Sequence, residues 1–300
     1  MKSIPIPAAS PPPPPSIFPA GASTAFGCPR DFLDNRFVYT VVSPRARGLS
    51  VGINMNPDQH CNFDCVYCEV KRDATGRGAQ LDVEDMASEL QLTIELVLSG
   101  RIRERPNYRG LSDELLKLRH VALSGDGEPT LCPNFTEALE TVVHLRARGR
   151  FPFYKLVLIT NASGLDRPEV GAGLSLLTPR DEVWAKLDAG TPDYMQRVNR
   201  PDCSLEKILG NILQLARRRP VIIQSLFPSI KGESPSAPEI DAYVQRLRDL
   251  KEAGAQIPLV QIYSATRPTA QSECGHLPLR TLSAIALRVR EATGLEAEVF

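Results

Sequence analysis

Three cysteines, Cys61, Cys65 and Cys68, lie close together in a short segment that follows an apolar run. Thiolates at this spacing can bind three of the four irons of a cubane iron–sulfur cluster, whereas most electron-transfer clusters are closed by four cysteines. The fourth iron then has no protein ligand and can bind a substrate. The spacing therefore predicts a cluster that takes part in chemistry.

A second segment that could bind a ligand is Gly125-Asp126-Gly127-Glu128-Pro129, which follows another apolar run. Glycines let the backbone approach a ligand closely, and the glutamate supplies a carboxylate. The alternative is a simple turn between a strand and a helix, because Gly, Asp and Pro all favour turns. The segment indicates a ligand-binding site only in combination with the three cysteines.

Short apolar runs alternate with amphipathic stretches along most of the chain. The predicted strands are Leu49–Asn54, His120–Ser124, Lys155–Asn161, Val183–Leu187, Val221–Phe227 and Leu259–Tyr263. The predicted helices are Val83–Ser99, Phe135–Arg148, Glu169–Leu177, Leu205–Arg218, Pro238–Ala253 and Leu279–Thr293.

This strict alternation predicts a mainly parallel sheet with right-handed crossovers. Six strand–helix units are fewer than the eight of a closed barrel. The sequence therefore predicts an α/β fold with a partial (β/α)6 barrel that is open on one side. An open doubly wound sheet is the alternative. In both folds ligands bind at the carboxyl ends of the strands, where both motifs fall.

The chain divides by composition into three parts. Residues 1–25 are rich in proline and predict a disordered tail. Residues 26–48 are a mixed segment that leads into the main domain, residues 49–300. In this mixed segment four apolar side chains are expected to pack on the main domain: Phe32, Phe37, Val38 and Tyr39.

The overall composition excludes some partners and compartments. Lysine plus arginine equals aspartate plus glutamate, so the formal net charge is zero and gives no global attraction to nucleic acid or acidic membranes. No stretch approaches the roughly twenty apolar residues of a membrane helix. The odd number of cysteines, seven, does not suit a complete set of disulfides. A cytoplasmic protein with reduced thiols is expected.

Together, the two motifs and the βα pattern resemble the radical S-adenosylmethionine (SAM) superfamily over residues 49–263. The resemblance implies a four-iron–four-sulfur (4Fe-4S) cluster on Cys61, Cys65 and Cys68, with SAM bound to the fourth iron. It implies reductive cleavage of SAM to a 5′-deoxyadenosyl radical, which abstracts hydrogen from a substrate. An electron donor such as flavodoxin or ferredoxin would supply the electron, as for other oxidoreductases of this kind.

The resemblance also implies which other residues contact SAM. Tyr67 matches an aromatic residue near the adenine, and Gly127 with Glu128 matches a segment that binds the methionyl ammonium. Asp126 stands where the commoner pattern has a glycine. At two later strand ends, Asn161 and Asp188 match residues that contact SAM, and Lys186 replaces the usual serine. The full set is Tyr67, Asp126, Gly127, Glu128, Asn161, Lys186 and Asp188.

The role of Lys186 stays open at this point. Its side chain should share a strand face with that of Asp188, so it could pair with Asp188 or with the SAM carboxylate. A Schiff base formed by a lysine of lowered pKa is a less favoured alternative. Arg200 could bind the SAM carboxylate or the substrate, although a surface arginine is the default. Gln224 and Gln261 either line the site or satisfy buried backbone groups.

A zinc-stabilised binding module, with His60 as fourth ligand, is the alternative to the cluster. The other cysteines, Cys28, Cys132, Cys203 and Cys274, lack local pairs and are expected to be free thiols. Within the superfamily the chain most resembles uncharacterised bacterial relatives of the wyosine-base tRNA synthases. The substrate, a small molecule or tRNA, is left open.

Overall fold

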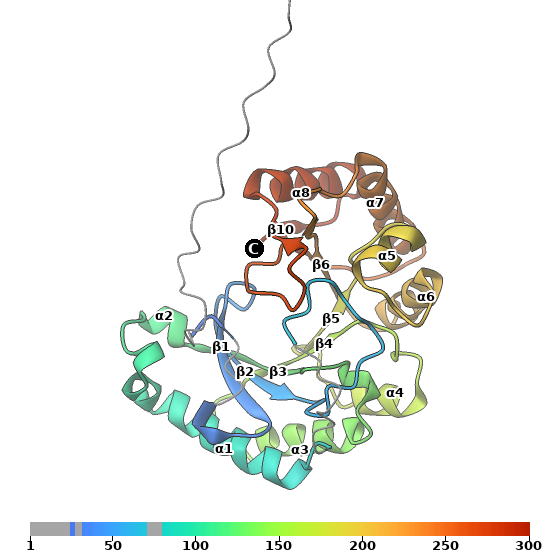
Figure 1. The fold of residues 1–300 in the computed structure, drawn as a ribbon. Coiled ribbons are helices and arrows are strands. Elements are labelled where there is room, and N and C mark those ends of the chain that lie inside the picture. The colour runs from blue at the N-terminus through green and yellow to red at the C-terminus, as the bar shows by residue number, and fades with distance from the viewer. Residues whose placement is uncertain (1–24, 28–31, 71–79) are drawn as a thin grey trace, which may run out of the picture.

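The computed structural model of the protein describes residues 25–27, 32–70 and 80–300. Its centre is one curved sheet, in which the strands follow one another in chain order (Figure 1). The strands of this sheet are β1 (Val38–Ser43), β2 (Gly48–Asn54), β3 (Leu118–Ser124), β4 (Lys155–Thr160), β5 (Glu182–Lys186), β6 (Ile222–Leu226), β8 (Val260–Tyr263) and β10 (Ala297–Val299).

All neighbours in this sheet run parallel except β1, which pairs with β2 in the antiparallel sense. A second, two-stranded sheet joins β7 (Ser229–Ile230) to β9 (Cys274–Gly275). A doubly wound sheet reverses its strand order at a switch point, and no such reversal occurs here. The prediction of a partial barrel is therefore confirmed, and the doubly wound alternative is wrong.

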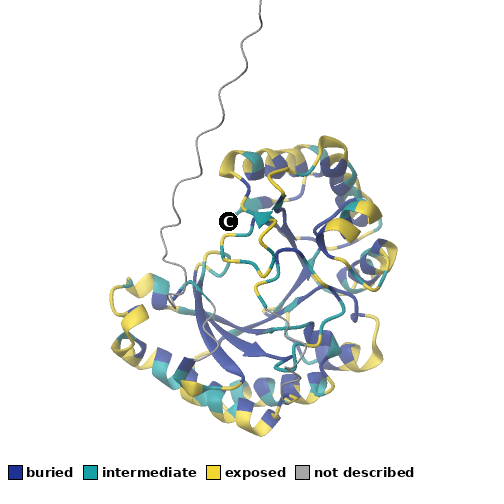
Figure 2. Cartoon of the chain, in the orientation of Figure 1, coloured by how far each residue is buried: buried dark blue, intermediate teal, exposed yellow. Residues whose placement is uncertain are grey.

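Helices cover the convex side of the sheet, and their exposed faces point away from it (Figure 2). The helices are α1 (Val83–Leu98), α2 (Asp113–Leu116), α3 (Phe135–Ala147), α4 (Pro168–Leu174), α5 (Pro192–Val198), α6 (Leu205–Ala216), α7 (Ala237–Glu252) and α8 (Leu279–Thr293). Short 3-10 helices lie at Phe32–Asp34, Arg101–Glu104, Pro106–Tyr108 and Pro129–Leu131. Among the described residues, no helix combines the length and apolar character that a bilayer crossing requires.

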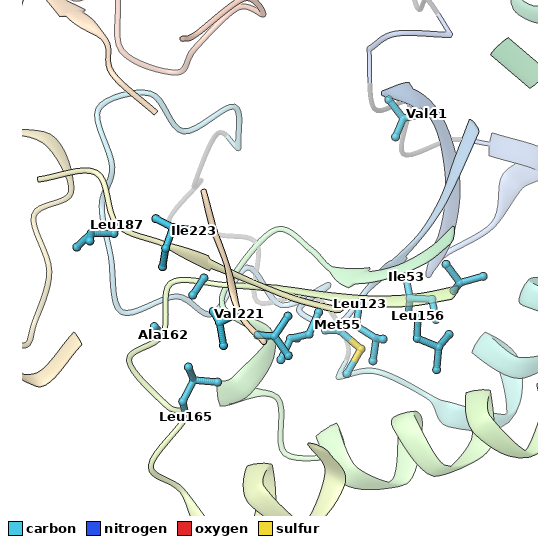
Figure 3. Packing of buried hydrophobic residues seen from close by; sticks show 14 of the residues in the cluster. Val41, Ile53, Met55, Leu123, Leu156, Ala162, Leu165, Leu187, Val221 and Ile223 are labelled. Carbon is cyan, nitrogen blue, oxygen red and sulfur yellow. The ribbon is translucent and has the colours of Figure 1, made fainter. Parts of the chain in front are cut away.

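The main core lies between the sheet and these helices. Every second side chain of a strand points to this layer, so Ile53, Leu123 and Leu156 are fully or almost fully buried there (Figure 3). On the helix side, Met86, Leu90 and Ile94 recur at the helical period along α1 and are equally buried. The opposite side chains of the strands face the inside of the half-barrel.

The predicted strands and long helices are all present, with ends that shift by at most a few residues. The mixed segment 26–48 differs from its prediction, because it contributes β1 to the sheet. Its predicted packing residues, Phe32, Phe37, Val38 and Tyr39, are buried as expected. Of the predicted tail, residues 1–24 lie outside the described residues, whereas Ala25 is buried and its carbonyl accepts a hydrogen bond from the Val42 N–H (2.7 Å).

The turn between β1 and β2 crosses the open side of the half-barrel. Arg47 in this turn forms an ion pair with Glu298 of β10 (2.7 Å), at the other edge of the sheet. Both side chains are largely exposed, so the pair adds little to stability. The neighbouring Arg45 belongs to the same turn and lines the half-barrel cavity described below.

Candidate active site

The predicted motifs meet in one cavity of about 300 Å³, which we call the site cavity. It lies at the carboxyl ends of the strands, where parallel-sheet enzymes bind ligands. Its wall includes Cys61, Cys65, Tyr67, Cys68, Asp126, Gly127, Glu128, Asn161 and Lys186. A larger hollow of about 980 Å³ lies on the outer side of the cysteines, but its lining includes neither Gly127 nor Glu128.

The cysteines belong to residues 55–70, the cysteine loop, which follows β2 directly. This loop pairs with the segment after α5. The Asp64 N–H donates to the Asn199 carbonyl (3.0 Å), and the Val66 N–H donates to the Val198 carbonyl (2.9 Å). Such backbone bonds leave few orphan polar groups. These backbone bonds therefore fix the loop conformation, and the loop holds three partly exposed cysteines on the wall of the site cavity.

The three thiols lie on the wall of one cavity, where either a cluster or a single zinc ion was predicted to bind. Among the described residues, no three His, Cys, Asp or Glu side chains converge as ligands of a single metal ion. A zinc site needs its sulfurs at about 2.3 Å from one ion, and His60, its predicted fourth ligand, does not line the site cavity. A cubane takes each thiolate at a different iron, and a cluster on Cys61, Cys65 and Cys68 stays a prediction.

Cys65 is the most enclosed of the three thiols. Burial raises its pKa to about 12, although hydrogen bonds from Tyr67 and Asn199 oppose the shift. The Asn199 Nδ2 lies 3.4 Å from the Cys65 sulfur. A metal centre must therefore displace the thiol proton when it binds, as thiolate ligation requires.

Gly127 lies where its backbone approaches the backbone of the cysteine loop so closely that no side chain fits. A Cβ atom at this position would lie 1.9 Å from the His60 carbonyl oxygen. The adjacent Glu128 N–H donates to that same oxygen. The glycine thus lets the segment after β3 contact the cysteine loop directly, which brings Glu128 beside the thiols.

Gly127→Ala is expected to push the cysteine loop away and to lower stability by about 1–3 kcal/mol, the usual cost of overpacking. The iron bound after reconstitution should fall to a minor fraction of the wild-type value. Gly171→Ala is the matched control, because a Cβ there meets nothing within 4 Å. It should be neutral or stabilising by up to about 1 kcal/mol. Equal iron content in both variants would contradict this account of the glycine.

Glu128 is held in one orientation by hydrogen bonds to both carboxylate oxygens. Its Oε1 accepts from the Thr130 N–H (3.1 Å), the Thr130 hydroxyl (2.7 Å) and the Thr160 hydroxyl, and its Oε2 accepts from the Asn161 N–H (2.7 Å). Burial raises the pKa of this carboxyl, and those donors oppose the shift. Oε2 therefore keeps capacity to accept a further donor from the site cavity.

Asp188 is the centre of a buried polar cluster beneath the site cavity. Its Oδ2 accepts from the Tyr67 hydroxyl and from Asn199 Nδ2 (2.8 Å), and its Oδ1 accepts from the Leu226 N–H (2.8 Å) and pairs with Lys186 (3.3 Å). Asp188 does not line the site cavity. Its direct contact with SAM thus stays a prediction, and its observed contacts position Tyr67.

Lys186 forms the predicted ion pair with Asp188. Burial by itself would lower the pKa of Lys186, but the charge of Asp188 and the neighbouring Tyr263 outweigh it and raise the pKa. Its Nζ also lies 3.2 Å from the Tyr263 hydroxyl and 4.8 Å from the centroid of the Tyr67 ring. A protonated amine is not a nucleophile, so the ion-pair interpretation fits the structure better than the Schiff base.

Two other predicted residues, Asp126 and Asn161, form hydrogen bonds to the segments around the site cavity. The Asp126 carboxylate accepts from Asn54 Nδ2 at the end of β2 (2.8 Å). The Asn161 side chain donates to Asn62 of the cysteine loop (3.0 Å) and accepts from the Ser163 N–H (2.9 Å), which is a turn-capping contact. Both residues line the site cavity, and their contact with SAM stays a prediction.

Several weaker candidates lie elsewhere. Arg200 pairs with Asp64 (3.3 Å) on the outer side of the cysteine loop, so it is a surface residue. Gln224 lines the site cavity and binds Gln261 (3.0 Å), which does not. Cys28 lies outside the described residues. The other free cysteines, Cys132, Cys203 and Cys274, do not line the site cavity.

Three residues in or beside the site cavity were not predicted from the sequence. The Asn199 Nδ2 lies within hydrogen-bond distance of Cys65, Tyr67 and Asp188. The sequence around Asn199 predicts only a loop. Tyr263 ends β8 and lines the cavity, and its strand-end position was a usable signal. Arg45 also lines the cavity, from a turn that no motif marks.

Comparison with known proteins gives a consistent answer. A sequence model of the Radical SAM superfamily matches residues 55–242. UPF0026 protein slr1464 of Synechocystis sp. is 32% identical over 179 residues, which cover 58% of this chain and 57% of that protein. UPF0026 protein MJ1312 of Methanocaldococcus jannaschii is 29% identical over 174 residues, 57% of this chain and 47% of that protein. The matches thus span only about half the length of these relatives.

Solved structures share the fold at low identity. A radical SAM methyltransferase from Sphaerobacter thermophilus superposes with a TM-score of 0.59 and 16% identity, covering 88% of this chain and 68% of that one. A structure of TYW1 with a lysine–pyruvate adduct bound gives 0.55 and 14%, covering 85% and 84%. These values establish the curled half-barrel and say nothing of the substrate.

Proposed function

The chain belongs to the radical SAM superfamily of enzymes, and from this membership we propose that Cys61, Cys65 and Cys68 hold a 4Fe-4S cluster that binds SAM. When bound, the cluster and SAM supply the reductive cleavage that yields a 5′-deoxyadenosyl radical, which abstracts hydrogen from the substrate. The observation that carries the proposal is the meeting of the three thiols and Glu128 in one cavity at the strand ends.

The chain's own residues bind and orient the reactants. Glu128 is fixed by four hydrogen bonds, so its free acceptor capacity can hold the methionyl ammonium of SAM without reorganisation. Tyr67 is buried beside the cysteines and offers a ring for the adenine. Asn161 and Asp126 keep the two loops in register, and the surrounding strands restrict water.

Partners and compartment are part of the same proposal. An electron donor such as flavodoxin or ferredoxin would supply the electron for cleavage, and the cytoplasm would keep the thiols reduced. The substrate is a small molecule or tRNA, and the zero net charge adds no support for tRNA.

The proposal is tested on protein reconstituted without oxygen. We expect a brown protein with about four irons per chain, and formation of 5′-deoxyadenosine from SAM after chemical reduction, measured by chromatography with mass spectrometry. Deuterium transfer into deoxyadenosine from labelled cell extract would then reveal the hydrogen donor. A colourless protein with one tightly bound zinc and no SAM cleavage would instead favour the binding module.

The affinity for SAM should also depend on pH through Glu128. Its pKa is raised above the ordinary value of 4.5 by burial, so in the free protein the carboxylate takes up a proton at a higher pH than an exposed glutamate does. A protonated carboxyl cannot balance the ammonium charge. Equilibrium binding of SAM should therefore weaken as the pH falls through this raised pKa, and Glu128→Gln should lack that pH dependence.

A further inference from the structure

Arg45 is a cation in the site cavity for which the described chain provides no anion. It is half-buried in the turn between β1 and β2 and lines the cavity. Its Nε is buried and has no hydrogen-bond partner. No carboxylate of the described residues lies within ion-pair distance of its guanidinium, which is unusual for an enclosed arginine.

The other cavity cations are already balanced. Lys186 pairs with Asp188 (3.3 Å), and Arg267 pairs with Glu69 (2.6 Å). Of the cationic side chains that line the cavity, Arg45 is thus the one without an ion-pair partner among the described residues. Leaving its buried Nε without a hydrogen-bond partner is costly, and a bound acceptor would remove that cost.

Tyr263 brings two of these cations together. The Arg45 Cζ lies 4.1 Å from the centroid of the Tyr263 ring, and the Lys186 Nζ lies 5.4 Å from the same centroid and 3.2 Å from the hydroxyl. Stacking on an aromatic face orients a guanidinium while leaving its N–H donors free. Two cations on one ring also repel each other, and a bound anion would relieve that repulsion.

This cation group draws on three parts of the sheet: the turn before β2, the end of β5 and the end of β8. Tyr263 ends β8 and Lys186 ends β5, whereas the cysteine loop follows β2 and Glu128 follows β3. Lys186 and Tyr263 thus reach the cavity from other strands than those that lead into the cysteine loop and Glu128. Because the sheet curls, a substrate held beside Tyr263 would lie across the cavity from a cofactor held at Glu128.

We infer that Arg45, together with Lys186 and Tyr263, binds an anionic oxygen group of the substrate, a carboxylate or a phosphate. The planar guanidinium suits two-pronged hydrogen bonding to either group. This inference rests on the proposed function, because it assigns the remaining wall of the cavity to SAM and the cluster. It adds a class of substrate, a small acid or a phosphate ester.

The test measures binding of two simple anions, acetate and inorganic phosphate, to reconstituted protein by calorimetric titration. The wild type should bind at least one of them saturably at one site per chain, and whichever binds more tightly identifies the carboxylate or the phosphate class. Arg45→Gln should weaken that binding at least about tenfold, and Arg45→Lys should weaken it less. Arg47→Gln is the matched control from the same turn, with an expected change below about twofold.

A second measurement needs no variant. Phenylglyoxal modifies accessible arginines, and peptide mass spectrometry can follow Arg45 and Arg47 separately in one protein sample. The better-bound anion should slow modification of Arg45 several-fold and leave Arg47 unaffected. Equal rates with and without the anion, or equal affinities in Arg45→Gln and wild type, would overturn the inference.

Two further outcomes separate this inference from the proposed function. If SAM displaced the anion competitively, Arg45 would belong to the SAM site and the inference would be wrong. If the anion bound as expected but the reduced protein formed no 5′-deoxyadenosine, the proposed function would be contradicted and the anion site would still be supported. Formation of 5′-deoxyadenosine without any anion binding in the wild type would overturn the anion site alone.

Discussion

Replacing Cys61, Cys65 and Cys68 together by alanine is expected to abolish both cluster binding and formation of 5′-deoxyadenosine. Thiolates are the ligands that iron–sulfur clusters require, and the described residues offer no substitute set of metal ligands nearby. Iron content, visible absorption and deoxyadenosine yield should all fall to background in anaerobically reconstituted protein. The fold should remain, because the backbone bonds of the cysteine loop do not depend on the thiols.

Cys274→Ala is the control for the loss of a free thiol. Cys274 is partly exposed and lies outside the site cavity, so iron content and cleavage should match the wild type. Circular dichroism and the free energy of unfolding, measured on metal-free proteins, would establish that the triple variant is folded. Cluster signals that persisted in a folded triple variant would refute the assignment of the three ligands.

The second large effect is expected for Glu128→Gln. The change keeps the shape of the side chain but removes the charge and turns one acceptor into a donor. The new amide N–H group would point either at the Asn161 N–H and the threonine hydroxyls or at the ammonium of SAM. All of these groups are themselves donors, so the contact would be unfavourable. Hydrogen bonds to charged groups contribute about 1.5–3 kcal/mol, so the dissociation constant for SAM should rise roughly 10- to 150-fold.

Glu239→Gln controls for the loss of a buried carboxylate as such. Glu239 is also buried, and its oxygens accept from the Gly190 N–H (2.5 Å) and the Thr191 hydroxyl (2.5 Å), away from the site cavity. It should lower stability without changing the affinity for SAM. Comparable SAM affinities in the two variants would show that Glu128 does not bind the cofactor.

The fold could be predicted because its main elements are long and strictly periodic. Each parallel strand is a short apolar run between helices whose buried faces repeat every three or four residues, as along α1. The prediction failed for β1 and β10. Strand β10 has only three residues, too few to show a pattern, and β1 adds an antiparallel strand before the βα alternation begins.

The site could be predicted only where a motif marks it. Cys61, Cys65 and Cys68 follow a recognisable spacing, and Gly127 with Glu128 follows a recognisable segment. Asn199 and Arg45 belong to the site through tertiary contacts, which no local pattern encodes. Asp188 was predicted from its strand-end position; its contacts with Asn199 and the Leu226 N–H are tertiary, and its contact with SAM stays a prediction.

The backbone hydrogen bonds between the cysteine loop and the end of α5 bear on how the protein responds to oxygen. A zinc finger loses its fold when its metal leaves, whereas here backbone hydrogen bonds keep the loop in place. Oxygen that destroys the inorganic centre should therefore leave an intact scaffold behind. If the proposed cluster is lost in this way, anaerobic reconstitution should restore the iron content without refolding the protein.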